Sequence, residues 1–482
     1  MGNAVKMRFG KKHQSLAFQL YLCGMPLVVL VSLFCYILFG NNIYSLITGF
    51  LFVFCFTLLY VIRYFGIISL YSIFLCTSSF FIYDAFWFSL FDRNKNFLFQ
   101  TFPTHYFFDS IIGVKFLLCC VLLTYVMHIA YCLIYYKRRL AFRQVHVHRK
   151  EFELFGIGIM LLFFIPSIVK LYIQFMYIKT HGYLAIFKGE LAELKYPIWT
   201  AGANLLFVTG FSIFVASNPS KRKFIFFSSL LFLLMAFNGA KGQRGVIIGP
   251  MVALLYWFTK KYDITLKLKS VFILFVFIIG ITYALGSLRS SYGQNTKVSS
   301  KNIHVLDLVS NVLYSQTNSR AVPMTIIKGD LPYHNYPFIF SPIFSFLGKI
   351  AFPSKGQDDV SLKKYNDISS ITVYSVSPRA YFRGNGYGGA FIAEAYDCGG
   401  FLGIIIWGVI LAFFIAFCDY SSLKIKNTYI PFLFLILLNF AMLPRDRFLA
   451  VLNNHLPKIL ILLLILPVIR EKLIWRCYEN EK

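Results

Sequence analysis

The chain has 482 residues, of which 58% are hydrophobic and 14% are charged, and its mean hydropathy is +0.66. A soluble domain is about 45 to 50% apolar, so this composition excludes a water-soluble globular protein and indicates an integral membrane protein. The formal net charge of +27 does not indicate nucleic-acid binding, because the basic residues lie in short segments between apolar runs. The ten cysteines form no C-x-x-C pair, which argues against a disulfide framework or a zinc site.

The first apolar run, Leu16 to Phe39, is too long for a signal-peptide core and no small-residue cleavage site follows it, so it is predicted to be a retained helix. Eleven further apolar runs follow at 43–62, 66–90, 110–136, 152–178, 197–217, 223–238, 246–258, 270–288, 388–417, 429–443 and 456–469. A helix that crosses a membrane needs about 20 apolar residues, so we expect an all-α membrane protein with about twelve transmembrane helices.

The basic residues are densest in the segments that would share a side with the N-terminus, such as Lys137 to Lys150 and Lys260 to Lys269. The positive-inside rule therefore predicts that both termini are cytoplasmic. The organisation that follows is nine helices in 1–288, a large extracytoplasmic loop in 289–386, three helices in 387–470 and a cytoplasmic tail in 471–482. A loop of about 95 residues should contain short helices of its own, separated at its prolines.

Seven arginines map to the predicted outer side, where the positive-inside rule does not place them. They are Arg244, Arg289, Arg320, Arg379, Arg383, Arg445 and Arg447. A guanidinium group matches two phosphate oxygens at once, so several of them together indicate a bound phosphate or pyrophosphate. The alternative is that they are interfacial anchors whose side chains extend toward water.

The turn Lys241-Gly-Gln-Arg244-Gly245 combines two cations with two flexible glycines, and backbone N–H groups at the start of the next helix would add to its attraction for an anion. The runs that flank it, 223–238 and 246–258, are short for a full crossing. We therefore expect this turn to lie below the membrane surface, buried in protein or lining a wet cavity.

Glu394 and Asp397 are expected within the first two turns of an otherwise apolar helix. A carboxylate at this depth is costly unless it is paired, which indicates either a functional group or a structural ion pair with an arginine. Asp84, His334, Asp446 and His455 are further candidates at the same level. The adjacent pair Asp358-Asp359 does not predict a metal site, because its side chains diverge.

These features resemble the O-antigen polymerases of the Wzy type over most of residues 150 to 470. The resemblance rests on the turn at Lys241 to Gly245 and its aliphatic continuation, the large loop after the ninth span, the segment from Ser377 to Glu394 that closes on Gly399, Gly400 and Gly403, and the turn Arg445-Asp446-Arg447. It implies an inner-membrane enzyme that transfers a growing glycan from undecaprenyl pyrophosphate to a hydroxyl of a new lipid-linked repeat unit.

The resemblance further implies that no metal or other cofactor takes part. The pyrophosphate would be held by Lys241, Arg244, Arg289, Arg379, Arg383, Arg445 and Arg447. Glu394 is the first candidate for the general base, followed by His455 and Asp446. The related O-antigen ligases carry a histidine in a comparable position, and this chain has none next to Glu394.

Three alternatives stay open: an O-antigen ligase, a glycosyltransferase that uses a polyprenyl-phosphate sugar, and a flippase for lipid-linked oligosaccharides. A flippase is disfavoured because the chain shows no paired repeats and few charges deep in its spans. The expected partners are undecaprenyl-pyrophosphate-linked glycans and membrane lipid, not nucleic acid. A chain-length regulator of the Wzz type is left open as a further partner.

Overall fold

The computed structural model describes residues 10–40, 42–90, 99–100, 106–138, 149–186, 190–192, 194–241, 245–266, scattered positions between 269 and 284, 317–354, 356–424, 427–450 and 455–468. Within these ranges the protein is built from helices, and its one extended pairing is the isolated bridge between Gln100 and Phe107. The expectation of an all-α fold is confirmed for this part of the chain.

Seven helical segments are long and apolar enough to cross a membrane. They lie in α1 (Gly10–Leu38), α2 (Ile43–Phe65), α6 (Ser110–Arg138), α7 (Lys150–His181), the pair η3 (Ile198–Thr200) and α8 (Ala203–Ala216), α9 (Lys221–Ala240) and α19 (Gly400–Lys424). Shorter apolar helices include α3 (Leu70–Phe81), α20 (Ile430–Phe440) and His455–Val468. The chain is therefore a multi-pass membrane protein. The number twelve stays a prediction, because the ninth run, 270–288, lies largely outside the described residues.

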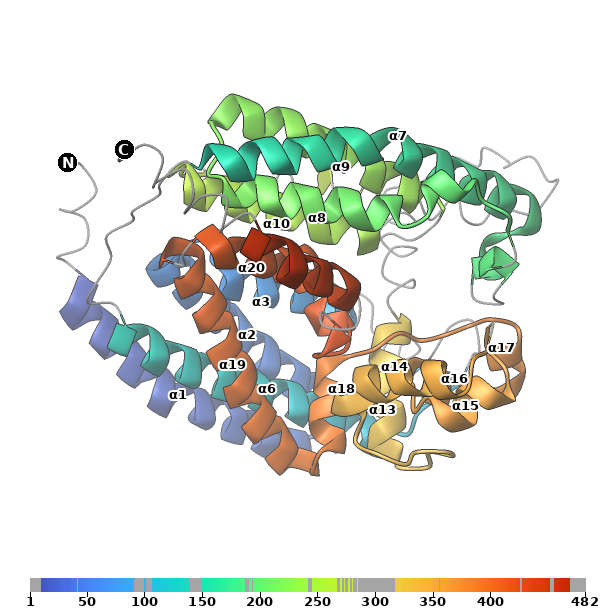
Figure 1. Cartoon of the computed structure of the whole chain (residues 1–482). Coiled ribbons are helices and arrows are strands. Elements are labelled where there is room, and N and C mark those ends of the chain that lie inside the picture. Colours follow the sequence, from blue (N-terminus) through green and yellow to red (C-terminus); the bar gives the residue numbers. More distant parts are fainter. Residues whose placement is uncertain are drawn as a thin grey trace, which may run out of the picture.

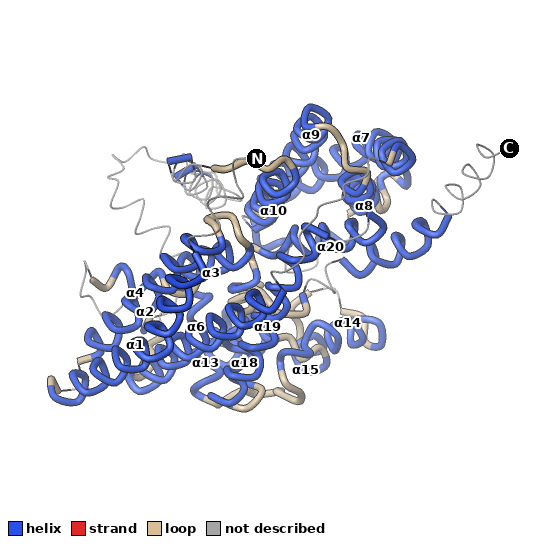
Figure 2. Tube along the Cα trace, turned by 90° about the vertical axis from the view of Figure 1, so that its left-hand side faces the viewer, coloured by secondary structure: helices blue, strands red, loops and turns tan. Residues whose placement is uncertain are grey.

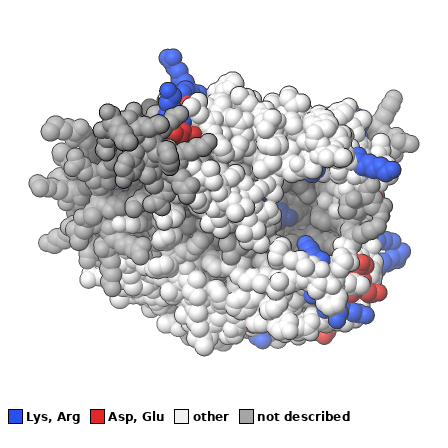
Figure 3. Space-filling model, viewed as in Figure 1, with Lys and Arg blue, Asp and Glu red and all other residues white. Residues whose placement is uncertain are grey.

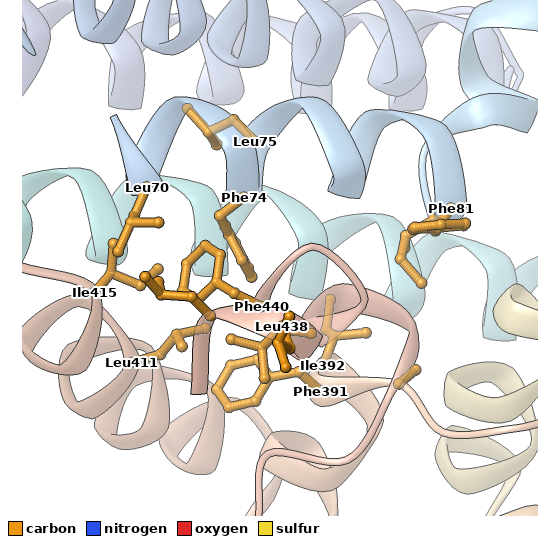
Figure 4. Packing of buried hydrophobic residues seen from close by; sticks show 14 of the residues in the cluster. Leu70, Phe74, Leu75, Phe81, Phe391, Ile392, Leu411, Ile415, Leu438 and Phe440 are labelled. Carbon is orange, nitrogen blue, oxygen red and sulfur yellow. The ribbon is translucent and has the colours of Figure 1, made fainter. Parts of the chain in front are cut away.

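The helices form two groups that share a core (Figures 1 and 2). One group holds α7, α8, α9 and α10 (Gly245–Lys261), and the other holds α1, α2, α6 and α19. The short helices α3 and α20 lie between them, and Figure 4 shows Phe74 of α3 close to Leu411 of α19 and Phe440 of α20. All three side chains belong to one buried cluster, so the two groups are packed into one body.

The run 388–417 is not one helix, which corrects the expected position of Glu394 and Asp397. They lie on a separate short helix, α18 (Phe391–Asp397), and the membrane span begins after it. The break occurs because Gly399 and Gly400 have φ values of 140° and 63°, which favour glycine. At Gly403 an added Cβ would lie 2.1 Å from the carbonyl oxygen of Ala395, so only glycine lets α19 pack this closely on α18.

Helix α9 has 20 residues and is long enough to cross, whereas the apolar run 223–238 predicted a shorter segment. It is longer because the basic residues Lys221 to Lys223 and the residues Asn238 to Ala240 are also helical. The shortness of this run therefore no longer argues that the turn after it lies below the membrane surface.

The described part of the large loop folds into short helices, as expected. They are α13 (Thr317–Lys328), α14 (Ser341–Ala351), α15 (Asp359–Lys364), α16 (Ile368–Val376) and α17 (Pro378–Phe382). Pro323, however, lies inside α13 and does not separate two helices. Asp358 caps α15 by accepting a 2.8 Å hydrogen bond from the N–H of Ser361, and Asp367 caps α16 in the same way. The Asp358-Asp359 pair thus marks the start of α15.

Described residues next to several segments that were predicted on the cytoplasmic side meet at one end of the bundle. Asp419 of α19 accepts hydrogen bonds from the N–H of Leu70 and the hydroxyls of Tyr131 and Tyr256, at 2.8 to 3.2 Å. These groups belong to four helices, α3, α6, α10 and α19. Asp419 therefore joins the ends of both helix groups.

Candidate functional site

Two segments singled out in the sequence meet at one end of α18. The first is the glycine-rich segment 384–389, and the second is the turn formed by Arg445, Asp446 and Arg447. An added Cβ on Gly389 would lie 3.0 Å from the backbone nitrogen of Arg447. Gly388, with φ of 84°, donates its N–H to the hydroxyl of Ser369 at 2.9 Å. Glycine thus allows the backbone to pass between α16 and the turn.

Glu394 lies where these segments join and is fully buried. Its Oε2 accepts a 2.8 Å hydrogen bond from the N–H of Phe448, while its Oε1 has no partner among the described residues. Burial raises the pKa of Glu394 well above its ordinary range, and the Phe448 N–H and the Arg447 charge oppose that shift. A buried carboxyl with an unused oxygen and a raised pKa is typical of a group kept for proton transfer.

Arg447 is held beside this carboxyl by a second acid. Its Nη1 donates to Oδ1 of Asp367 at 2.6 Å, and Oδ2 of Asp367 simultaneously caps α16. Asp446 accepts the N–H of Arg447 through its Oδ1, at 2.8 Å. Burial also raises the pKa of Asp446, and the Arg447 charge opposes the shift. Asp367 therefore fixes the direction of the Arg447 guanidinium group, while Asp446 binds the backbone of the same residue.

The turn of Arg445, Asp446 and Arg447 also contacts α3 and lies close to the start of α10. The guanidinium carbon of Arg445 is 5.7 Å from the ring centroid of Phe81, at the end of α3. An added Cβ on Gly245 would lie 2.9 Å from the Met442 side chain, three residues before Arg445. The start of α10 and the turn after α20 are therefore neighbours.

Lys241, the first residue of the turn after α9, is buried and donates to Oε1 of Gln174 at 2.8 Å. Burial, with the Lys170 charge, lowers the pKa of Lys241 to about 8. A lysine in this state stays largely charged at neutral pH and would gain from a nearby anion.

Arg379 and Arg383 are not brought to this place, because they are exposed on and after α17. Arg244 and Arg289 lie outside the described residues. His455 is buried, with its Nδ1 3.0 Å from Nζ of Lys458 and its Nε2 without a partner among the described residues. No contact recorded between described residues joins His455 to Glu394.

The remaining candidates form structural contacts. Asp84 pairs with Arg320, and both are buried, so this pair ties α13 to the start of α4 (Asp84–Phe88). Asp397 accepts a hydrogen bond from the N–H of Phe338 at 2.7 Å and lies 3.1 Å from Nε2 of His334, whose pKa it raises.

Asp367 was missed in the sequence because Asp-x-x-Ser is an ordinary helix start and nothing local indicates its pairing with Arg447.

The surface is hollowed between the α7–α8 layer and the loop helices α14 to α17, and Lys and Arg side chains lie at the margin of the hollow (Figure 3). The described residues hold no cluster of three His, Cys, Asp or Glu side chains suited to a metal ion. The site described above can bind an anion through its cations and can exchange a proton through Glu394.

A family model described as O-antigen polysaccharide polymerase Wzy matches residues 22–474 of this chain. No curated protein and no solved structure gives a significant match. The family model spans both the turn after α9 and the turn after α20, and it includes Glu394.

Proposed function

The chain belongs to the O-antigen polysaccharide polymerase Wzy family, and from this we propose that it joins undecaprenyl-pyrophosphate-linked repeat units into a surface polysaccharide. The reaction takes place on the outer side of a bacterial inner membrane. The growing glycan leaves its lipid carrier and is joined to a hydroxyl of a new lipid-linked repeat.

In the proposed step, the acceptor hydroxyl forms a bond to the anomeric carbon of the growing glycan while the bond from that carbon to the pyrophosphate oxygen breaks. The hydroxyl proton passes to the carboxylate of Glu394, and the negative charge develops on the departing pyrophosphate. Arginines fixed in a site poor in water stabilise this charge more than water would. Arg445 and Arg447 lie in the turn beside Glu394 and are the first candidates for this role.

The observation that carries the proposal is the state of Glu394: a fully buried carboxyl with one oxygen fixed by Phe448 and the other unpartnered among the described residues. A raised pKa makes the ionised form a stronger base. Because the side chain is covered, the acceptor can reach it only after the covering segments shift. The glycine-rich segment 384–389 next to it has the conformational freedom for such a movement.

The function is tested by the surface glycans of a strain that lacks this gene. A polymerase defect should leave single repeat units attached to the lipid core, and a plasmid copy of the gene should restore the ladder of longer chains. Bare core with no repeat attached would instead indicate a ligase or a flippase.

We also propose that glycan transfer proceeds without a metal ion, since the charge on the leaving pyrophosphate is neutralised by arginine. Elongation of purified lipid-linked repeats by the purified protein should therefore survive EDTA. Loss of elongation in EDTA, restored by a divalent cation, would favour a glycosyltransferase that uses a polyprenyl-phosphate sugar.

The sidedness of the site is a further part of the proposal. Membrane-impermeant thiol reagents should label a cysteine placed at Asp330, in the large loop, in intact spheroplasts. A cysteine placed at Asp263, in the turn after α10, should be labelled only after the membrane is opened. The opposite pattern would place the loop in the cytoplasm and would contradict the whole assignment.

A further inference from the structure

Helix α14 in the large loop has its apolar side outward. Ile343, Phe346, Leu347 and Ile350 follow the i, i+3, i+4, i+7 spacing of one helix face, and each is between 38% and 67% exposed. The opposite face is formed by Ser341, Ser345 and Gly348, which are buried. A helix on the surface of a water-soluble domain shows the reverse arrangement, with apolar residues inside and polar residues outside.

The small residues on the inner face are needed for the packing of α14 against the loop. An added Cβ on Gly348 would lie 2.9 Å from the carbonyl oxygen of Lys364 at the end of α15. The helix is therefore seated firmly on α15 through its small side chains. Rotation of α14 that turned the apolar residues inward would destroy this contact.

The start of α14 is tied to the start of a membrane span. The N–H of Phe338, three residues before α14, donates to Asp397 at 2.7 Å, and Asp397 is three residues before α19. The short helix η4 (Phe338–Phe340), which leads into α14, packs against α18, which leads into α19. The first turns of α19 also expose apolar side chains, including Phe401 and Leu402, which would face lipid. The apolar side of α14 thus begins at the level where the lipid-facing surface of the bundle begins.

Cations lie near the edge of this apolar face. Lys349 is exposed on α14 itself, and Lys364 is exposed with its Nζ 5.0 Å from the ring centroid of Phe352. Lysines that flank an apolar helix face typically reach toward lipid phosphates while the face enters the acyl-chain boundary.

We propose that the apolar side of α14 lies in the acyl-chain boundary of the membrane leaflet on the side of the candidate site. The occupant of this face is bilayer lipid. The contact holds the loop helices at membrane level, next to the plane in which the phosphates of lipid-anchored molecules lie. This inference requires the chain to be a membrane protein and does not depend on the reaction it performs.

The test uses the full-length protein with p-benzoylphenylalanine in place of Ile350, reconstituted in vesicles of phosphatidylethanolamine and phosphatidylglycerol whose acyl chains carry an alkyne. After irradiation, the lipid adduct on the protein is measured by attaching a fluorophore to the alkyne. The same replacement at Leu402, on α19, is the positive control, and at Asp330, an exposed carboxylate in the loop, it is the negative control.

The expected result is an adduct at position 350 as intense as at position 402, and none above background at position 330. No substrate is present in the vesicles, so such an adduct reports bilayer lipid. An adduct at 402 with none at 350 would overturn the proposal. A cross-linked protein dimer from position 350 in place of the lipid adduct would overturn it as well, by assigning the face to a second copy of the chain.

Discussion

Replacing Glu394 with Gln should reduce glycan elongation by about two to four decades, the usual contribution of a positioned general base. Gln has nearly the same shape and keeps an oxygen that can accept the N–H of Phe448, so the contact that fixes the side chain is retained. Gln carries no ionisable carboxyl, so it cannot accept the proton of the acceptor hydroxyl. The protein should therefore fold and reach the membrane at normal levels while its glycan ladder collapses to short products.

The pH dependence of the same variant separates a catalytic from a structural role. A general base acts in its ionised form, so the wild-type rate should fall as pH drops through the pKa of Glu394. Because burial raises that pKa, the fall should occur above the ordinary value of 4.5 for a glutamate. The residual activity of the Gln variant should lack this acidic limb, whereas damage to packing would lower the rate at every pH alike.

The matched control is Asp397→Asn on the same helix. Asp397 contacts the N–H of Phe338 and His334, and an Asn oxygen can still accept the N–H, so elongation should stay near the wild-type level. A wild-type ladder from Glu394→Gln would remove Glu394 from the reaction. Equal losses in both variants would mean that α18 acts only as a structural element.

The membrane class and the helical fold could be predicted from composition and apolar runs, because those quantities add over many residues. Details that depend on single residues could not. The break between α18 and α19 comes from the backbone of Gly399 and Gly400, which lie inside an otherwise continuous apolar pattern. Phe81 and Asp84 likewise end one helix and start another within a run that looks like one span.

The roles of the candidate site residues stay a prediction, and the structure shows only where the described ones lie. Short motifs indicated which turns carry charge, and the structure brings the turn after α20 against the glycine-rich segment and next to Gly245. What the sequence could not provide is the pairing between distant residues. Arg320 was grouped with the anion-binding arginines, yet it forms a buried ion pair with Asp84. Arg447 is oriented by Asp367, which is eighty residues away in the chain. The sequence around Arg379 and Arg383 also did not indicate that these two side chains would be exposed.

Replacing Arg445 with Ala should also slow elongation by roughly two to four decades. A charge-assisted hydrogen bond contributes about 1.5 to 3 kcal/mol, and a guanidinium group on pyrophosphate makes two of them. Arg445 lies next to the buried carboxyl site and only partly in contact with solvent, so water replaces its interaction poorly. Arg383 is exposed, and its replacement should cost less for that reason.

Arg445→Lys decides between pyrophosphate binding and an interfacial anchor. Lysine keeps the charge but loses the planar fork, so it should restore only part of the activity if two phosphate oxygens are bound at once. An anchoring cation would be replaced by lysine without loss, because either side chain reaches the interface. The measurement is the length distribution of the glycan ladder, compared at equal amounts of protein in the membrane as judged by blotting. Arg222→Ala, at an exposed position at the far end of α9, is the control for the loss of one positive charge. A wild-type ladder from Arg445→Lys would show that Arg445 is an interfacial cation. The negative charge that develops on the departing pyrophosphate would then have to be stabilised by Arg447 or by cations in the turn after α9.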